Sequence, residues 1–277
     1  MAKIGERATL KVLREKPCGL YLDGEALGEI LLPRREMPAT PVIGEFLDVF
    51  LYHDSEDRPV ATLKTPKAMA GQFTRLKCVA VTGVGAFLDW GLPKELLVPF
   101  REQKTRMVID KSYLVYVHVD KISGRIIATT RIARQLDLIP HTFKPGDVVN
   151  LIIFGKTDLG YKAIINGTHS GLIFASEVFQ NLQPGECTSG YVVAVRDDGK
   201  IDLSLQALGR SKVMELEESI LRELSARGGY WAIGDHTPAA DINEELGVSK
   251  RTFKQAIGAL MKKNSIMIEE RGIRLMK

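Results

Sequence analysis

An aromatic or basic side chain recurs two residues after a glycine in three separate stretches of the sequence. The glycine and the side chain that follows it are Gly19 and Tyr21, Gly85 and Phe87, and Gly160 and Lys162. Exposed aromatic rings can stack on nucleobases, and lysine or arginine cations can contact phosphates. Packing in a hydrophobic core is the alternative role for the two aromatics. The pattern makes these three positions candidates for binding a nucleic acid.

Further candidates lie one strand later in each stretch. Leu32, Val98 and Phe174 are predicted to occupy corresponding positions there. The cations just beyond could line a groove, and they are Arg34, Arg35, Arg101, Lys104 and Arg106. Phe100 and Tyr161 complete the aromatic candidates. An ordinary solvated surface is the alternative role for the basic cluster.

Signals for catalysis or metal binding are weak. The segment that begins at Gly83 fails as a dinucleotide fingerprint, because Leu88 stands where the third glycine would be. The five histidines are dispersed, and the three cysteines lack the Cys-x-x-Cys spacing of a zinc site. We therefore expect no enzymatic activity, no cofactor and no metal site.

Composition and charge are those of an ordinary globular protein, with 45% hydrophobic and 26% charged residues and a formal net charge of +4. The small positive excess permits a polyanionic partner without requiring one. Charged residues interrupt the N-terminal segment, and no apolar run reaches the roughly 20 residues that span a bilayer. We expect a cytoplasmic protein with no membrane partner and no small-molecule substrate.

Strand-like segments repeat three times between residues 1 and 208. Gly19, Gly85 and Gly160 stand 66 and 75 residues apart, and the hydroxyl residues Thr62, Thr129 and Ser204 stand 67 and 75 residues apart. A repeat of this length is a domain-sized unit. We predict three five-stranded barrels at residues 1–64, 65–137 and 138–208, with a short connecting helix that starts at Thr65-Pro66.

The pattern becomes helical in residues 209–277. Leu216, Ile220 and Leu224 share one helix face, Thr237-Pro238 begins a second helix, and Ser249 begins a third. A terminal hairpin follows, and this order is the layout of a winged helix. Lys250, Arg251 and Lys254 would give the third helix a positive face for nucleic acid, and docking to a protein is the alternative.

The order of these motifs resembles the conserved virulence factor B (CvfB/YitL) family of bacterial proteins over essentially the whole chain. The resemblance rests on Val84-Gly85-Ala86-Phe87-Leu88-Asp89, on Leu96-Leu97-Val98-Pro99-Phe100 and on residues 241–254. It implies a mostly β fold with an α-rich C-terminus, in which three tandem S1-type OB barrels precede a winged helix. The aromatic that S1 domains carry before the bend glycine is replaced by Cys18, Val84 and Leu159.

The same resemblance implies a non-enzymatic protein that binds single-stranded RNA and regulates gene expression after transcription. Two other functions remain open. The winged helix could read duplex DNA in a transcription regulator, or the modules could dock onto proteins, for example on ribosomes.

Overall fold

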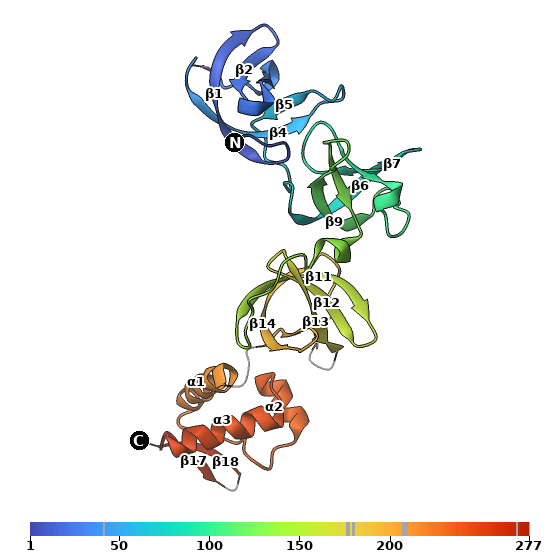
Figure 1. Cartoon of the computed structure of the whole chain (residues 1–277). Coiled ribbons are helices and arrows are strands. Elements are labelled where there is room, and N and C mark those ends of the chain that lie inside the picture. The colour runs from blue at the N-terminus through green and yellow to red at the C-terminus, as the bar shows by residue number, and fades with distance from the viewer. Residues whose placement is uncertain (41, 176–177, 179–180, 207–209, 270, 277) are drawn as a thin grey trace. The chain divides into compact units, whose positions relative to one another are not determined.

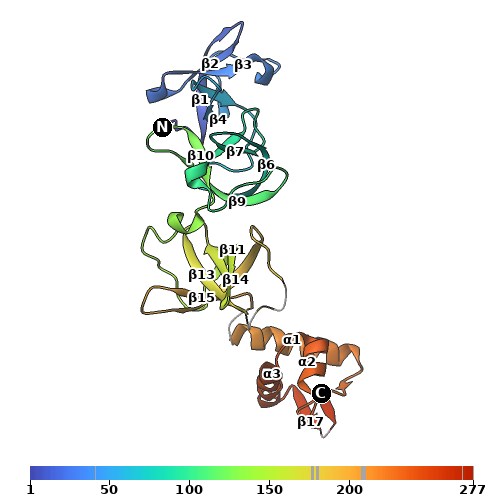
Figure 2. The same cartoon turned by 90° about the vertical axis from the view of Figure 1, so that its right-hand side faces the viewer.

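The computed structural model describes residues 1–277 except 41, 176–177, 179–180, 207–209, 270 and 277. The chain forms three closed five-stranded barrels and a C-terminal group of helices with a three-stranded sheet (Figures 1 and 2). Contacts group it into two compact units, residues 1–142 with 150–188 and residues 143–149 with 189–277. The predicted fold class is confirmed. The predicted limit at 208–209 lies outside the described residues, and the other domain limits stay predictions.

The three barrels share one strand order. The first contains β1 (Arg7–Lys16), β2 (Gly19–Asp23), β3 (Glu29–Pro33), β4 (Phe46–His53) and β5 (Pro59–Thr62). The second contains β6 (Phe73–Val81), β7 (Gly85–Asp89), β8 (Leu96–Pro99), β9 (Ser112–Val119) and β10 (Ile126–Thr129). The third contains β11 (Val148–Thr157), β12 (Gly160–Ile165), β13 (His169–Phe174), β14 (Cys187–Val195) and β15 (Ile201–Ser204). In each, the fifth strand lies between the third and the fourth.

Short 3-10 helices follow or connect several of these strands in the described part of the chain. They are η1 (Glu25–Leu27), η2 (Arg34–Glu36), η3 (Phe100–Glu102) and η4 (Ile132–Gln135). Two of them, η2 and η3, directly follow the third strand of their barrel, whereas η4 follows the last strand of the second barrel. The predicted basic cluster therefore begins on helical turns at the ends of β3 and β8.

The second strand of every barrel starts at a glycine that touches the third strand. The φ angles of Gly19, Gly85 and Gly160 are 148°, 158° and 150°. A Cβ atom at these positions would lie 2.0 to 2.3 Å from the carbonyl oxygen of Leu32, Val98 or Ile173. No side chain fits there unless the backbone itself moves. The spacing of these glycines in the sequence therefore reflects an equivalent backbone position in each barrel.

The hydroxyl at the end of each fifth strand is also an equivalent structural feature. Thr62, Thr129 and Ser204 are buried. Each hydroxyl oxygen accepts a hydrogen bond of 3.0 to 3.1 Å from the backbone N–H two residues later. Because a buried hydroxyl needs a partner, this bond fixes how the chain leaves the barrel. The bend glycines and the closing hydroxyls therefore occupy equivalent positions in three barrels of the same fold.

The first two barrels share part of one core. Phe50 and Tyr52 of β4 belong to the hydrophobic cluster that is built mainly by the second barrel. The ring of Phe50 meets Trp90 edge to face, with centroids 5.8 Å apart. Such aromatic contacts add to the free energy gained by burial. The first two barrels therefore stabilise each other.

The connection between these barrels contains no helix. The Lys67 N–H donates to the Trp90 carbonyl at 2.8 Å, and the Ala70 N–H donates to the Gly5 carbonyl at 2.9 Å. These bonds use donors that a helix would direct along its own axis. The helix predicted from Thr65-Pro66 is therefore wrong.

The C-terminal region has the predicted winged-helix elements. They are α1 (Arg210–Ala226), β16 (Tyr230–Trp231), α2 (Ala239–Leu246), α3 (Lys250–Lys262), β17 (Ile266–Glu269) and β18 (Gly272–Leu275). The core joins Leu216, Ile220 and Leu224 to Trp231 and Phe253. The Ser249 hydroxyl caps α3 by accepting from the Thr252 N–H at 3.2 Å. The N-cap of α2 is Pro238, and the Thr237 hydroxyl, which the sequence suggests as the cap, accepts a hydrogen bond from the Gly234 N–H.

We predict that Gly85→Ala destabilises the second barrel by about 2–4 kcal/mol, because its methyl group would overlap the Val98 carbonyl oxygen. Hydrogen exchange followed by mass spectrometry should show faster exchange in β6, β7 and β8. Gly83→Ala is the matched control, since a Cβ there meets no atom within 4 Å. Equal exchange in the two variants would contradict the steric role of Gly85.

Candidate nucleic-acid interface

Side chains along the second strand alternate between the barrel interior and its outer face. The residue after each bend glycine is buried, and these residues are Leu20, Ala86 and Tyr161. The next residue is at least partly exposed, and these residues are Tyr21, Phe87 and Lys162. This is the two-residue period of a strand. The structure thus brings the three predicted residues to equivalent outward positions, while Tyr161 is only 6% exposed.

The predicted equivalence of Phe174 with Leu32 and Val98 is wrong by one residue. Phe174 pairs with Gly160, as Pro33 pairs with Gly19 and Pro99 with Gly85. Ile173 is therefore the counterpart of Leu32 and Val98, and all three are fully buried. Because a shift of one residue changes the face of a strand, Phe174 lies half-buried at the outer position instead.

In the first barrel, Tyr21 lies beside two cations. The Arg14 guanidinium and the Lys16 ammonium each lie 5.1 Å from the centre of its ring. Its hydroxyl lies 3.5 Å from the Cys18 sulfur, and this hydrogen bond raises the pKa of Tyr21. The phenol therefore stays neutral at physiological pH. An aromatic ring beside two positive charges can stack on a base while the cations meet its phosphates.

The two predicted arginines of η2 are exposed but partly engaged. Arg34 donates to the Pro17 carbonyl at 3.4 Å. Arg35 lies 3.8 Å from the carboxylate of Glu36, which is buried and accepts a hydrogen bond from the Thr62 hydroxyl. The charge of Arg35 is therefore partly compensated by its neighbour.

In the second barrel, Phe87 is half-buried on the wall of a cavity of about 360 Å³. Tyr52, Trp90, Lys94 and Arg125 also line this cavity, and Asp57 of the same lining forms ion pairs with both cations. Beyond β8, the Arg106 guanidinium covers the ring of Phe100 at 3.8 Å. Phe100 and Arg106 therefore form a stacked pair in which the cation covers one face of the ring.

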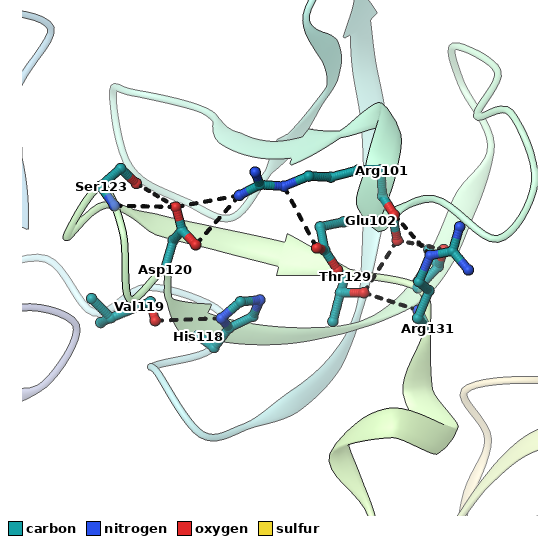
Figure 3. A network of polar contacts seen from close by, with 9 residues as sticks. Arg101, Glu102, His118, Val119, Asp120, Ser123, Thr129 and Arg131 are labelled. Carbon is teal, nitrogen blue, oxygen red and sulfur yellow. Dashed lines mark hydrogen bonds and ion pairs between the residues drawn. The ribbon is translucent and has the colours of Figure 1, made fainter.

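The charge of Arg101 is neutralised within the protein. Its guanidinium lies 3.4 Å from the carboxylate of Asp120 and 3.8 Å from that of Glu102 (Figure 3). The Ser123 hydroxyl donates to Asp120 at 2.7 Å. This hydrogen bond, with the Arg101 charge, holds the pKa of Asp120 below its usual value. Arg101 therefore contributes little free positive charge.

Lys104 and Lys162, which the sequence placed in different domains, line the same groove. We call this cavity of about 330 Å³ the basic groove; its cationic lining residues are Lys104, Arg131, Arg134, Lys156 and Lys162. Among the residues that the structure describes, none of those lining the groove is acidic. Sequence reasoning missed Arg131, Arg134 and Lys156. For Arg131 and Arg134 the sequence offered a signal, because these two arginines stand three residues apart and begin two residues after the closing hydroxyl Thr129.

On α3, two of the three predicted cations have partners within the winged helix. The Lys250 ammonium donates to the Thr237 carbonyl at 2.8 Å. Lys254 forms a 2.7 Å ion pair with Asp235, which lowers the pKa of that carboxyl. Arg251 is exposed, and the structure gives it no ion pair among the residues it describes. Arg251 is therefore the most available cation of the three.

Among the residues that the structure describes, no group of three metal-binding side chains occurs. None of their helices combines the length and the apolar character needed to cross a membrane.

Residues 4–64 match the family model of the S1 domain, and residues 218–275 match that of the CvfB-like winged helix domain. The chain is 30% identical to the uncharacterized protein YitL of Bacillus subtilis, over 96% of this chain and 91% of that protein. It is 25% identical to conserved virulence factor B of Staphylococcus aureus, over 85% of this chain and 81% of that protein. A crystal structure of a Streptococcus pneumoniae multidomain protein with nucleic acid binding domains aligns at 22% identity, over 99% and 98% of the two chains, with a TM-score of 0.41.

We predict that Asp120 makes the stability of the second barrel depend on pH. A carboxyl whose pKa is lower in the folded state stabilises the protein above its unfolded pKa, and that stabilisation is lost as the pH falls through the folded pKa. The free energy of unfolding should therefore drop below about pH 4. Asp120→Asn should make this drop smaller in urea titrations at pH 6 and pH 3.

Ser123→Ala tests the cause of this effect, because it removes the hydroxyl donor and keeps the carboxylate. It should reproduce part of the change caused by Asp120→Asn. Stability curves that run parallel in the wild type and in Asp120→Asn between pH 6 and pH 3 would contradict this assignment.

Proposed function

The chain belongs to the CvfB/YitL family, and we propose that it is a non-enzymatic protein that binds single-stranded RNA across the outer faces of its barrels. The repeated outward position after the bend glycine carries the proposal. It holds an aromatic ring in two barrels and a lysine in the third. Rings with flanking cations bind single strands because stacking tolerates every base and the cations follow the backbone. The role implied by the family resemblance is post-transcriptional regulation.

The winged helix supports this binding through Arg251 in our proposal. Asp235 compensates the charge of Lys254, and the Lys250 ammonium is held by the Thr237 carbonyl, so both side chains are engaged within the module. A helix that reads duplex DNA usually needs several free cations and polar groups at the groove. These internal bonds favour single-stranded RNA over duplex DNA as the ligand, and they keep docking to a protein as the second candidate function of this module.

We expect the purified protein to bind a labelled unstructured RNA more tightly than a DNA duplex of matched sequence. Fluorescence anisotropy at two salt concentrations measures both affinities. The RNA affinity should fall with salt, since cations that contact phosphates release counterions on binding. Preference for the duplex would transfer the function to the winged helix, and failure to bind either ligand would favour protein docking.

We also predict that Phe87→Ala weakens RNA binding about 5- to 150-fold, which corresponds to the roughly 1–3 kcal/mol that one stacked base contributes. Val81→Ala is the control, because it removes an exposed apolar side chain from the same barrel. Thermal unfolding must show that both variants stay folded. Loss of the fold in Phe87→Ala would identify Phe87 as a core residue, and unchanged affinity in a folded variant would exclude stacking there.

A further inference from the structure

The basic groove concentrates positive charge that the protein does not neutralise. Among the described residues, none of its five cations forms an ion pair, whereas Arg101, Lys67 and Arg125 are each paired with a carboxylate. Unpaired cations on a concave surface focus their field on whatever enters it. The groove therefore fits a ligand that brings several negative charges.

The cations of the groove lie on a fixed frame. Ile132 and Leu136, in and directly after η4, are buried and anchor this helix. The Nε atom of Arg131 donates to the Arg101 carbonyl at 2.8 Å, which orients its guanidinium. The Lys156 ammonium lies 5.3 Å from the centre of the Tyr161 ring. Because these side chains are already oriented, they lose less conformational entropy when a ligand binds.

Part of the lining of the groove is apolar. Phe154, at the bulge of β11, lines the groove and packs against the cluster that contains Ile132 and Leu136. Apolar walls lower the local dielectric constant and so strengthen the attraction between the cations and an anion. The open space of about 330 Å³ suits a stretch of a flexible chain.

We propose that the basic groove binds consecutive phosphates of a single-stranded RNA that continues from the binding face of the third barrel. Lys162 connects the two surfaces, because it belongs both to the groove and to the outward position that Tyr21 and Phe87 occupy in the other barrels. This inference rests on the proposed RNA binding. The cations contact the sugar-phosphate backbone, so the groove adds affinity without preferring any base.

The test uses the full chain with Arg131→Gln, Arg134→Gln and Lys156→Gln combined. The control variant combines Lys3→Gln, Lys111→Gln and Lys121→Gln, which removes the same charge from exposed residues outside the groove. Anisotropy titrations with labelled U20 and A20 oligonucleotides between 0.05 and 0.3 M salt give the affinity and its salt dependence for each protein. Circular dichroism verifies that both variants are folded.

For the groove variant we expect a salt slope smaller by about 2 and an affinity at 0.1 M salt about a hundredfold lower, because each lost phosphate contact on a single strand accounts for a slope of about 0.7. The loss should be equal for U20 and A20. The control variant should stay within about threefold of the wild type, since charges remote from the ligand are screened.

Three results would overturn the proposal, and they are distinguishable. A wild type that binds neither oligonucleotide overturns the proposed function and the groove site together. A wild type that binds RNA, with a groove variant equal to the control variant, overturns the groove site alone. Displacement of RNA from the wild type by poly-glutamate as efficiently as by unlabelled U20 identifies the groove as a site for acidic proteins.

Discussion

The three barrels depend on one steric contact, the approach of a glycine at the start of the second strand to a carbonyl oxygen of the third. Gly19, Gly85 and Gly160 have no room for a Cβ atom. This contact fixes which residues of the second strand face the core and which face outward. The steric requirement for glycine is the same in all three barrels, whereas the side chain at the outward position differs among them. Tyrosine, phenylalanine and lysine at that position show how one scaffold carries different chemistry.

Internal partners, more than residue type, decide which cations are available to a ligand. Arg101 and Lys254 look equivalent to Lys104 and Arg134 in the sequence, yet the first two are held by carboxylates of their own module. A surface ion pair of this kind adds little to stability, but it does remove positive charge from the surface. Five cations without an ion pair among the described residues lie together in the basic groove, and none of its described lining residues is acidic.

The fold was largely predictable from the sequence, because glycine and hydroxyl landmarks report backbone constraints directly. The helix at Thr65-Pro66 failed because its donors bond to Gly5 and Trp90, which lie far away in sequence. The error at Phe174 arose from a register that only strand pairing reveals. The site was less predictable. Nothing local in the sequence shows that Asp120 neutralises Arg101, or that Arg131 and Lys156 line one groove.

The edge-to-face contact of Phe50 with Trp90 has a consequence for synthesis of the chain. Translation proceeds from the N-terminus, so β4 leaves the ribosome before the residue that completes its packing has been made. Until residue 90 emerges, Phe50 and Tyr52 lack the partners that bury them in the finished protein. Exposed aromatic surface on a nascent chain is a binding site for chaperones and a hazard for aggregation. The first barrel therefore reaches its native packing only as part of a two-barrel folding unit.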